Sequence, residues 1–334
     1  MNAASAPAQR PPWWRSASTK SLFKLLAGLL IVAALLSRLD LATTLDVLGR
    51  YRWSLLLLAL ALFALSCPIA ALRWKLFASE APLRKLLELT LVGQFYSIVL
   101  PGQIAGEVVK AYRLGRGAAD AERLAASVFV DRVIGVIALL LVACAGIALS
   151  PHHLPEALSV AILAVMTMLF FGLFALRIPV LHAFALGSAH WLSGTRLRRF
   201  APALERAIEA WRQFSRKPSR LVFSLILGIA FQLLAIGIYA VLGTNIGIQL
   251  TPYDWAWVVA IASVAVLLPL SIAGLGLREG ALVGCLAWLG VSGERAIALS
   301  LGVFAIMLSG AAAGGLLELI RIVRAATRSK ERME

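Results

Sequence analysis

Side chains that build disulfides, metal centres and acidic active sites are scarce in this sequence. Only three cysteines and four histidines occur in 334 residues, and 17 acidic residues stand against 32 basic ones. The cysteines lie far apart inside apolar segments, and the histidines have no carboxylate or cysteine at the spacing of metal ligands. We therefore expect buried structural thiols, no metal site and no cofactor.

Signatures of energy-coupled and hydrolytic enzymes are also missing. The chain has no Walker A loop, no nucleophile elbow and no zinc-protease helix. The basic residues behind its net charge of +15 lie at the edges of apolar segments instead of on a folded basic domain. That placement favours anionic membrane lipids as partners over nucleic acid. We expect a protein that is not an enzyme and has no catalytic residues.

Long apolar runs dominate what the sequence does contain. Hydrophobic residues make up 60% of the chain and the mean hydropathy is +0.87, as in integral membrane proteins. A helix needs about 17–25 residues to cross a bilayer core of about 30 Å. Runs at or near that length lie at about 22–37, 54–72, 124–149, 157–176, 221–242 and 296–320. We interpret the first as an uncleaved signal-anchor helix, because no cleavage signal follows it.

A seven-residue pattern, Leu-Pro-x-x-Ile-Ala-Gly, occurs twice, at Leu100–Gly106 and at Leu268–Gly274. Each copy interrupts an apolar segment (86–114 and 254–290) whose arms reach only about 16–22 Å at helical rise, too short to cross. Proline cannot continue a helix, and glycine permits tight turns. The predicted turn residues are Pro101, Gly102, Gly106, Pro269, Gly274 and Gly276. Broken helices at matching places in two halves are typical of transporters with internal repeats.

The distribution of lysine and arginine orients the predicted helices, since basic loops stay cytoplasmic. Segment 177–220 has nine basic residues and 110–123 has four, whereas 150–156 has none. If 86–114 crossed the membrane as one helix, the loop with nine charges would face outward. We therefore predict that 86–114 enters and leaves from the cytoplasm. The same argument predicts that 254–290 enters and leaves from outside.

The predicted fold is an all-α polytopic membrane protein built as an inverted repeat. It has about six spanning helices plus two re-entrant hairpins of broken helix, which makes eight hydrophobic helical units. Repeat one covers about 54–149 and repeat two about 221–320, within a single transmembrane domain at 21–324. The remaining predicted parts are a basic cytoplasmic tail at 1–20, a cytoplasmic amphipathic loop at 177–220 and a cytoplasmic tail at 325–334.

Charged side chains near the two turns are the candidate binding groups, because ionisable groups at membrane depth are costly and mark functional sites. The substrate-binding candidates are Glu107, Lys110, Asp131, Arg132, Arg278 and Glu279. The cations can bind a phosphate through charge-assisted hydrogen bonds, and the carboxylates can position them or engage a cationic headgroup. In a helix, Glu107 and Lys110 are i,i+3 neighbours and can pair. The alternative is that Asp131–Arg132 and Arg278–Glu279 belong to internal ion pairs that only lock the fold.

Three segments in this order, Leu100–Tyr112, Ser127–Gly135 and Ser271–Gly280, resemble the lysylphosphatidylglycerol synthase transmembrane family. This is the flippase-like membrane domain of bacterial multiple peptide resistance factors, also found as free-standing proteins, and the resemblance covers nearly the whole chain. It implies a multi-pass protein of the bacterial inner membrane, and the basic segments predict that both termini are cytoplasmic.

The sequence departs from this family at two places. The family usually shows Gly-Gly-Asp and an arginine where this chain has Ala105-Gly106-Glu107 and Lys110, which weakens a bidentate phosphate contact at Lys110. Because the chain ends at Glu334, soon after its last predicted span, we expect a free-standing member without the aminoacyl transferase domain.

The leading functional hypothesis is a lipid translocase that moves an anionic or modified-headgroup lipid between leaflets. The headgroup would pass through a polar cavity between the two hairpins, with the acyl chains left in the bilayer. Two alternatives stay open. One is a non-transporting membrane partner of a lipid or envelope synthesis enzyme, and the other is a glycosyl transferase acting on a polyprenyl-linked sugar.

Overall fold

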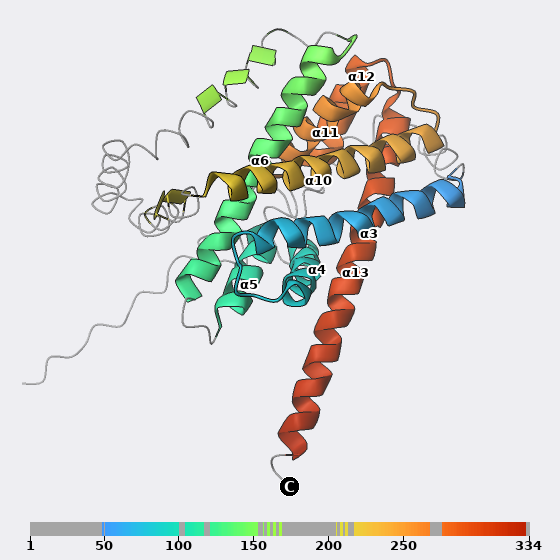
Figure 1. Cartoon of the computed structure of the whole chain (residues 1–334). Helices are drawn as coiled ribbons and strands as arrows, with labels where there is room; N and C mark the ends of the chain where they lie inside the picture. Colours follow the sequence, from blue (N-terminus) through green and yellow to red (C-terminus); the bar gives the residue numbers. More distant parts are fainter. Residues whose placement is uncertain are drawn as a thin grey trace, which may run out of the picture.

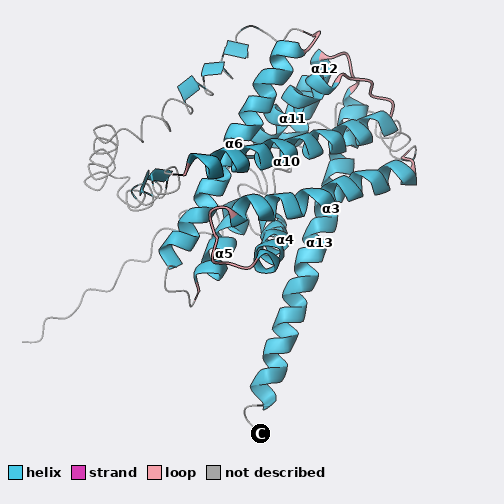
Figure 2. Ribbon diagram, in the orientation of Figure 1, coloured by secondary structure: helices cyan, strands magenta, loops and turns pink. Residues whose placement is uncertain are grey.

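The computed structural model describes residues 49, 51–99, 104–116, 121–152, 217–267 and 276–331, together with 156, 159–160, 163–164, 167–168, 205, 208–209 and 211–212. This part of the chain is helical and contains no strand (Figure 2). The eight helices whose bounds the structure gives are α3 (Trp53–Lys75), α4 (Leu83–Val99), α5 (Ile104–Gly115), α6 (Ala121–Leu149), α10 (Pro218–Asn245), α11 (Pro252–Leu267), α12 (Leu277–Trp288) and α13 (Gly293–Glu331).

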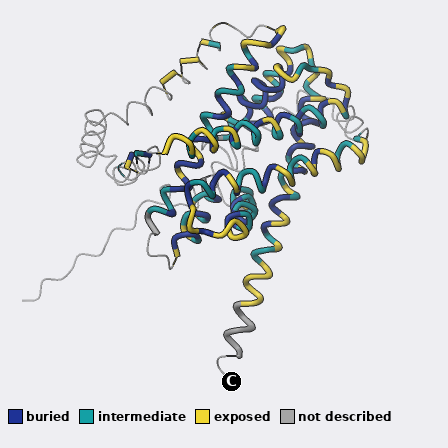
Figure 3. Tube along the Cα trace, viewed as in Figure 1, coloured by how far each residue is buried: buried dark blue, intermediate teal, exposed yellow. Residues whose placement is uncertain are grey.

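Four of these helices are long and apolar enough to cross a membrane. The candidate spans are Trp53–Lys75, Arg123–Leu149, Pro218–Asn245 and Gly293–Arg324. They confirm the multi-pass helical membrane protein predicted from the apolar runs. Large apolar side chains such as Trp53, Leu57 and Phe223 are exposed, as expected of helices that face lipid. Exposed and buried stretches alternate along the long helices in Figure 3. Of the other predicted runs, 22–37 lies outside the described residues, and so does most of 157–176.

Two pairs of shorter helices lie between the long ones in the chain. Helices α4 and α5 have 17 and 12 residues, and α11 and α12 have 16 and 12. At 1.5 Å per residue each is about 18–26 Å long, less than the thickness of a bilayer core. Within each pair the two helices pack against each other. The re-entrant insertion of these pairs and the inverted repeat stay predictions.

The predicted turn residues fall mostly between the paired helices. Pro101 and Gly102, like Pro269 and Gly274, lie outside the described residues. Gly276 precedes α12 with φ +85°, a left-handed conformation that favours glycine. Gly106 lies inside the first turn of α5, where an added Cβ would stand 2.2 Å from the carbonyl oxygen of Gly93 in α4. This glycine therefore lets the two helices of the first pair pack closely.

The contacts between the two halves are symmetric: the first helix of each half packs against the first helix of the other, and the second helix of each half packs against the last helix of the other. Helix α3 packs against α10, α4 packs against α13, and α6 packs against α11 (Figure 1). Each half also has its own core. One cluster joins α3, α4, α5 and α6 around Trp74 and Leu86, and a larger one joins α10, α11, α12 and α13 around Trp257 and Leu299. The space where the halves meet is lined by side chains from both.

Candidate functional site

A cavity of about 380 Å³ lies where the two halves meet. All eight helices named above contribute side chains to its lining, which combines apolar groups with several charged ones. Five of the six predicted binding residues line it: Glu107, Lys110, Asp131, Arg132 and Arg278. The sixth, Glu279, is next to Arg278 in α12 and is ion-paired with it. Candidates that lie up to 172 residues apart in the sequence, from Glu107 to Glu279, are therefore brought to one site.

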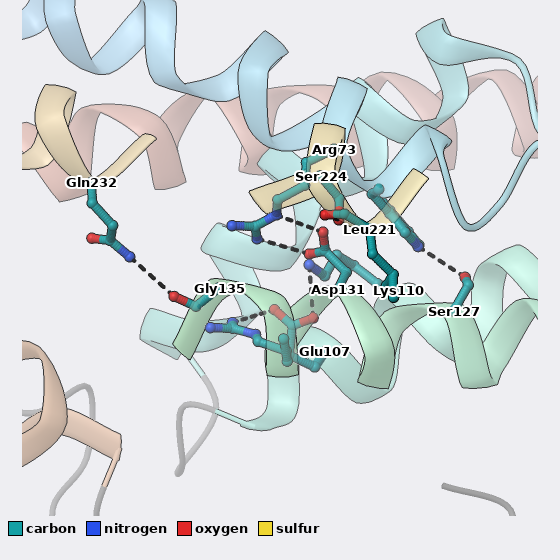
Figure 4. Close-up of polar contacts among 11 residues, drawn as sticks. Arg73, Glu107, Lys110, Ser127, Asp131, Gly135, Leu221, Ser224 and Gln232 are labelled. Atoms are coloured by element: carbon teal, nitrogen blue, oxygen red, sulfur yellow. Dashed lines mark hydrogen bonds and ion pairs between the residues drawn. The ribbon is translucent and has the colours of Figure 1, made fainter. Parts of the chain in front are cut away.

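Arg73, at the end of α3, is a cavity residue that sequence reasoning missed. Its Nε lies 2.7 Å from Oδ1 of Asp131 and its Nη2 lies 3.0 Å from Oδ2, a bidentate pair in which both residues are buried. Figure 4 shows the two hydrogen bonds between α3 and α6. The apolar run predicted at 54–72 ends just before Arg73, whereas α3 continues to Lys75.

A second charged cluster is formed by Glu107, Lys110 and Arg132. Lys110 Nζ lies 2.7 Å from Glu107 Oε2, which confirms the predicted i,i+3 pair, and Arg132 pairs with the other oxygen, Oε1. Asp131 and Arg132 therefore pair with different partners instead of with each other. The side chain of Lys110 is 11% exposed and that of Arg132 is 47% exposed. Arg132 is thus the more accessible cation of this cluster.

Aromatic rings hold the cations of both clusters. Lys110 Nζ lies 5.1 Å from the centre of the Trp74 ring, and the Trp74 indole donates to Ser127 Oγ at 3.0 Å. The guanidinium of Arg73 lies 5.8 Å from the centre of the Phe231 ring in α10. Contacts at these distances are favourable cation–π geometry. They add to the ion pairs that hold Lys110 and Arg73 in place.

The third cluster belongs to the second half and contains Arg278, Glu279 and Ser300. Arg278 Nη2 lies 2.7 Å from Glu279 Oε1, its Nε donates to Ser300 Oγ at 3.0 Å, and that hydroxyl donates to Glu279 Oε1 at 2.8 Å. Oε2 of Glu279 accepts the backbone N–H of Gly276 at 2.6 Å. The guanidinium also lies 5.6 Å from the centre of the Phe304 ring. This network fixes Arg278 at the cavity wall.

Carboxylate clusters at two other places join the hairpin helices to the long ones. Arg113 in α5 pairs with Glu318 in α13, and Tyr96 in α4 accepts from Arg113 at 3.2 Å. At the start of α11, Asp254 accepts hydrogen bonds from Ser150 Oγ at 2.5 Å and from Thr251 Oγ1 at 2.7 Å. These contacts tie α5 to α13 and α11 to the end of α6.

Metal ligation finds no support in the described residues, where no group of three or more histidine, cysteine, aspartate or glutamate side chains is placed to hold an ion. What the cavity offers instead is positive charge. Arg132 and Lys110 share one carboxylate, and Arg278 of α12 lines the same cavity. Such groups bind phosphate oxygens by charge-assisted hydrogen bonds.

Fold and site together define a helical multi-pass membrane protein with a charged internal cavity between its halves. Residues 21–315 match the family described as Lysylphosphatidylglycerol synthase TM region, and the chain belongs to this family, as its three motifs indicated. Comparisons with curated proteins and with solved structures find no match.

Proposed function

We propose that this protein is a lipid translocase that moves a lipid with an anionic headgroup between the two leaflets. The observation that supports this proposal most directly is the cavity between the halves, which has Lys110, Arg132 and Arg278 in its lining. Its volume of about 380 Å³ lies within the range of small-molecule sites, roughly 300–1,000 Å³. A phosphate headgroup would occupy the cavity while the acyl chains remain in the bilayer.

The proposed transport path uses the two pairs of short helices as re-entrant hairpins that enter from opposite sides. Their lengths support this, since none could cross a bilayer core alone. Corresponding contacts, α4 with α13 and α6 with α11, support an inverted repeat. In such repeats one half rocks against the other around a central site. The cavity would then open to each leaflet in turn.

The membrane orientation belongs to the same proposal. The family and the basic segments support a bacterial inner membrane protein with both termini in the cytoplasm. Arg52 and Asn245, at the starting end of α3 and the finishing end of α10, are hydrogen-bonded at 2.8 Å. Because these two helix ends lie side by side, α3 and α10 run in opposite directions, as the proposed topology requires.

A transporter is a better match to these side chains than an enzyme. Acting as a general base requires a carboxylate that can reach substrate. Glu107, Asp131 and Glu279 are each ion-paired with arginine or lysine. Their arrangement supports a role in holding cations for a headgroup.

The test is lipid movement by the purified protein in liposomes, with and without an imposed pH gradient. Acyl-labelled phosphatidylglycerol is placed in both leaflets, and an impermeant reagent quenches the outer one. We expect quenching beyond the outer-leaflet share with the wild type and at least a tenfold slower rate with Arg132→Gln. Arg84→Gln is the matched control, because Arg84 also pairs with a glutamate, Glu88, but on the surface. Quenching of phosphatidylglycerol that stops at the outer-leaflet share, both with and without the pH gradient, would overturn the proposal.

A further inference from the structure

We infer that the cavity selects a headgroup with a single negative charge and no amine, that is, a phosphodiester whose remaining part is neutral. This inference rests on the proposed function and names its substrate class. It follows from how the charges of the cavity are paired. The charged groups are Arg73, Glu107, Lys110, Asp131, Arg132, Arg278 and Glu279.

Among the described residues of the cavity, the charges leave one positive charge over. Arg73 with Asp131 is a neutral pair, and so is Arg278 with Glu279. Glu107 alone faces two cations, Lys110 and Arg132. The segments that link the paired helices, residues 100–103 and 268–275, carry no ionisable side chain.

The uncompensated positive charge belongs to the cluster of Glu107, Lys110 and Arg132, and Arg132 is its more accessible cation. Arg132 contacts one oxygen of Glu107 and has about half of its side chain exposed, while Lys110 is nearly buried between Glu107 and the Trp74 ring. One phosphodiester charge would neutralise the cluster. A phosphate monoester, which carries close to two negative charges at neutral pH, would leave one negative charge over beside the carboxylates of Glu107, Asp131 and Glu279.

An amine on the headgroup would find no counter-charge among the described residues of the cavity. Both oxygens of Asp131 accept from Arg73, and the two oxygens of Glu107 are divided between Lys110 and Arg132. The oxygens of Glu279 accept from Arg278, Ser300 and a backbone N–H.

The aromatic faces beside these carboxylates are occupied as well. Trp74 lies under Lys110, Phe231 under Arg73 and Phe304 under Arg278. An ammonium group entering the cavity would lose its hydration without gaining a carboxylate that is free of a cation. Uncharged groups have a place, because the neutral side chains of Gln94, Gln232 and Ser263 also line the space. The cavity therefore suits a hydroxyl-bearing phosphodiester.

The experiment compares four lipids that carry the same labelled acyl chain: phosphatidylglycerol, phosphatidylethanolamine, lysyl-phosphatidylglycerol and phosphatidate. With the full-length protein in liposomes, we expect phosphatidylglycerol to move at least tenfold faster than each of the other three. Arg132→Gln removes the uncompensated charge and should reduce that preference to less than threefold. Arg84→Gln, on the surface, should keep it. Equal rates for phosphatidylglycerol and either amine-bearing lipid would overturn the inference.

Binding separates this inference from the proposed function. If no lipid moves, the translocase proposal fails, and retention of the four lipids by the purified protein is then measured by native mass spectrometry. Preferential retention of phosphatidylglycerol that Arg132→Gln abolishes would still support the selected headgroup class. Equal retention of all four would overturn it.

Discussion

The charge of Arg73 is held inside the protein by a single carboxylate. Asp131 accepts both hydrogen bonds of the pair, and each residue is less than a tenth exposed. Asp131→Asn leaves the guanidinium buried without a counter-charge, a change that typically costs about 3–5 kcal/mol. We expect this variant to unfold at a clearly lower temperature than the wild type, measured by intrinsic fluorescence of the purified protein in detergent.

A double variant separates lost charge balance from lost packing. Replacing both partners of a buried pair by apolar residues is often neutral for stability, so Arg73→Met combined with Asp131→Leu should regain most of the loss. An Asp131→Asn protein as stable as the wild type would contradict the buried-pair account.

Residue-level prediction from the sequence works where partners are close in the chain. The spacing of Glu107 and Lys110 predicted their pair correctly. Asp131 and Arg132 line the same cavity and are both ion-paired, but their partners, Arg73 and Glu107, are on other helices and were not predicted. Which helix faces which is decided by tertiary packing, and adjacent residues in a helix point about 100° apart. Sequence spacing contains no information on such cross-helix partners.

Close contact between helices depends on glycines that sequence reasoning did not single out. A Cβ at Gly314 of α13 would stand 2.1 Å from the carbonyl oxygen of Leu91 in α4, so the two backbones approach through this glycine. We expect Gly314→Ala to destabilise the protein by about 1–3 kcal/mol, since overpacking forces backbone shifts. Thermal unfolding in detergent measures the effect.

Gly284 in α12 is the matched control, because a Cβ there would meet nothing within 4 Å. Gly284→Ala should be neutral or stabilise by up to about 1 kcal/mol through helix propensity. If the two variants shift stability equally, the α4–α13 contact is not the reason.

The contact between α11 and the end of α6 should depend on pH. Burial acts to raise the pKa of Asp254, but hydrogen bonds from Ser150, Thr251 and His152 outweigh it and hold the pKa below its usual value. A carboxyl with a lowered pKa in the folded state contributes stability above its ordinary pKa of about 4. That contribution is lost as the pH falls through the folded value.

Asp254→Asn should therefore remove part of the pH dependence of stability. Between about pH 5 and pH 3, the thermal midpoint of the wild type should fall more than that of the variant. Glu80→Gln, at a surface pair with Arg123, is the control and should follow the wild type. Parallel curves for wild type and Asp254→Asn would refute the assignment.

The helices were predicted well from the sequence, and their ends were predicted less accurately. Apolar run length predicted the four described spans and the four short helices, because crossing a bilayer sets a minimum length. The ends were less accurate, and α13 runs to Glu331 where the apolar run ends near residue 320. Charged residues continue a helix as readily as apolar ones, so the end of hydrophobicity is not the end of the helix.

At the scale of the whole molecule, the proposed topology places the loop before α11 outside and the loop after α3 in the cytoplasm. Gln249 and Ser79 are exposed positions in these two loops. In a background with Cys67, Cys144 and Cys285 replaced by serine, Gln249→Cys should react with an impermeant maleimide in intact spheroplasts. Ser79→Cys should react only after permeabilisation. Labelling of both from the same side would contradict the inverted topology.

Pairing of the halves could be anticipated only in outline. The repeated motif and the basic loops predicted two related units, and the contact of α4 with α13 has its counterpart in the contact of α6 with α11. The cavity could not be predicted from the sequence. Its lining comes from eight helices, and hydrophobic periodicity does not specify how these helices are rotated relative to one another. For that reason the sequence did not identify Arg73, Phe231 and Ser300 as residues of the site.

The most direct measurement is the movement of acyl-labelled phosphatidylglycerol in liposomes containing the wild type, Arg132→Gln or Arg84→Gln. A translocase with its headgroup site in the central cavity predicts quenching beyond the outer-leaflet share for the wild type and Arg84→Gln, with at least a tenfold slower rate for Arg132→Gln. Quenching confined to the outer leaflet for all three proteins, or equal rates for all three, would contradict the account.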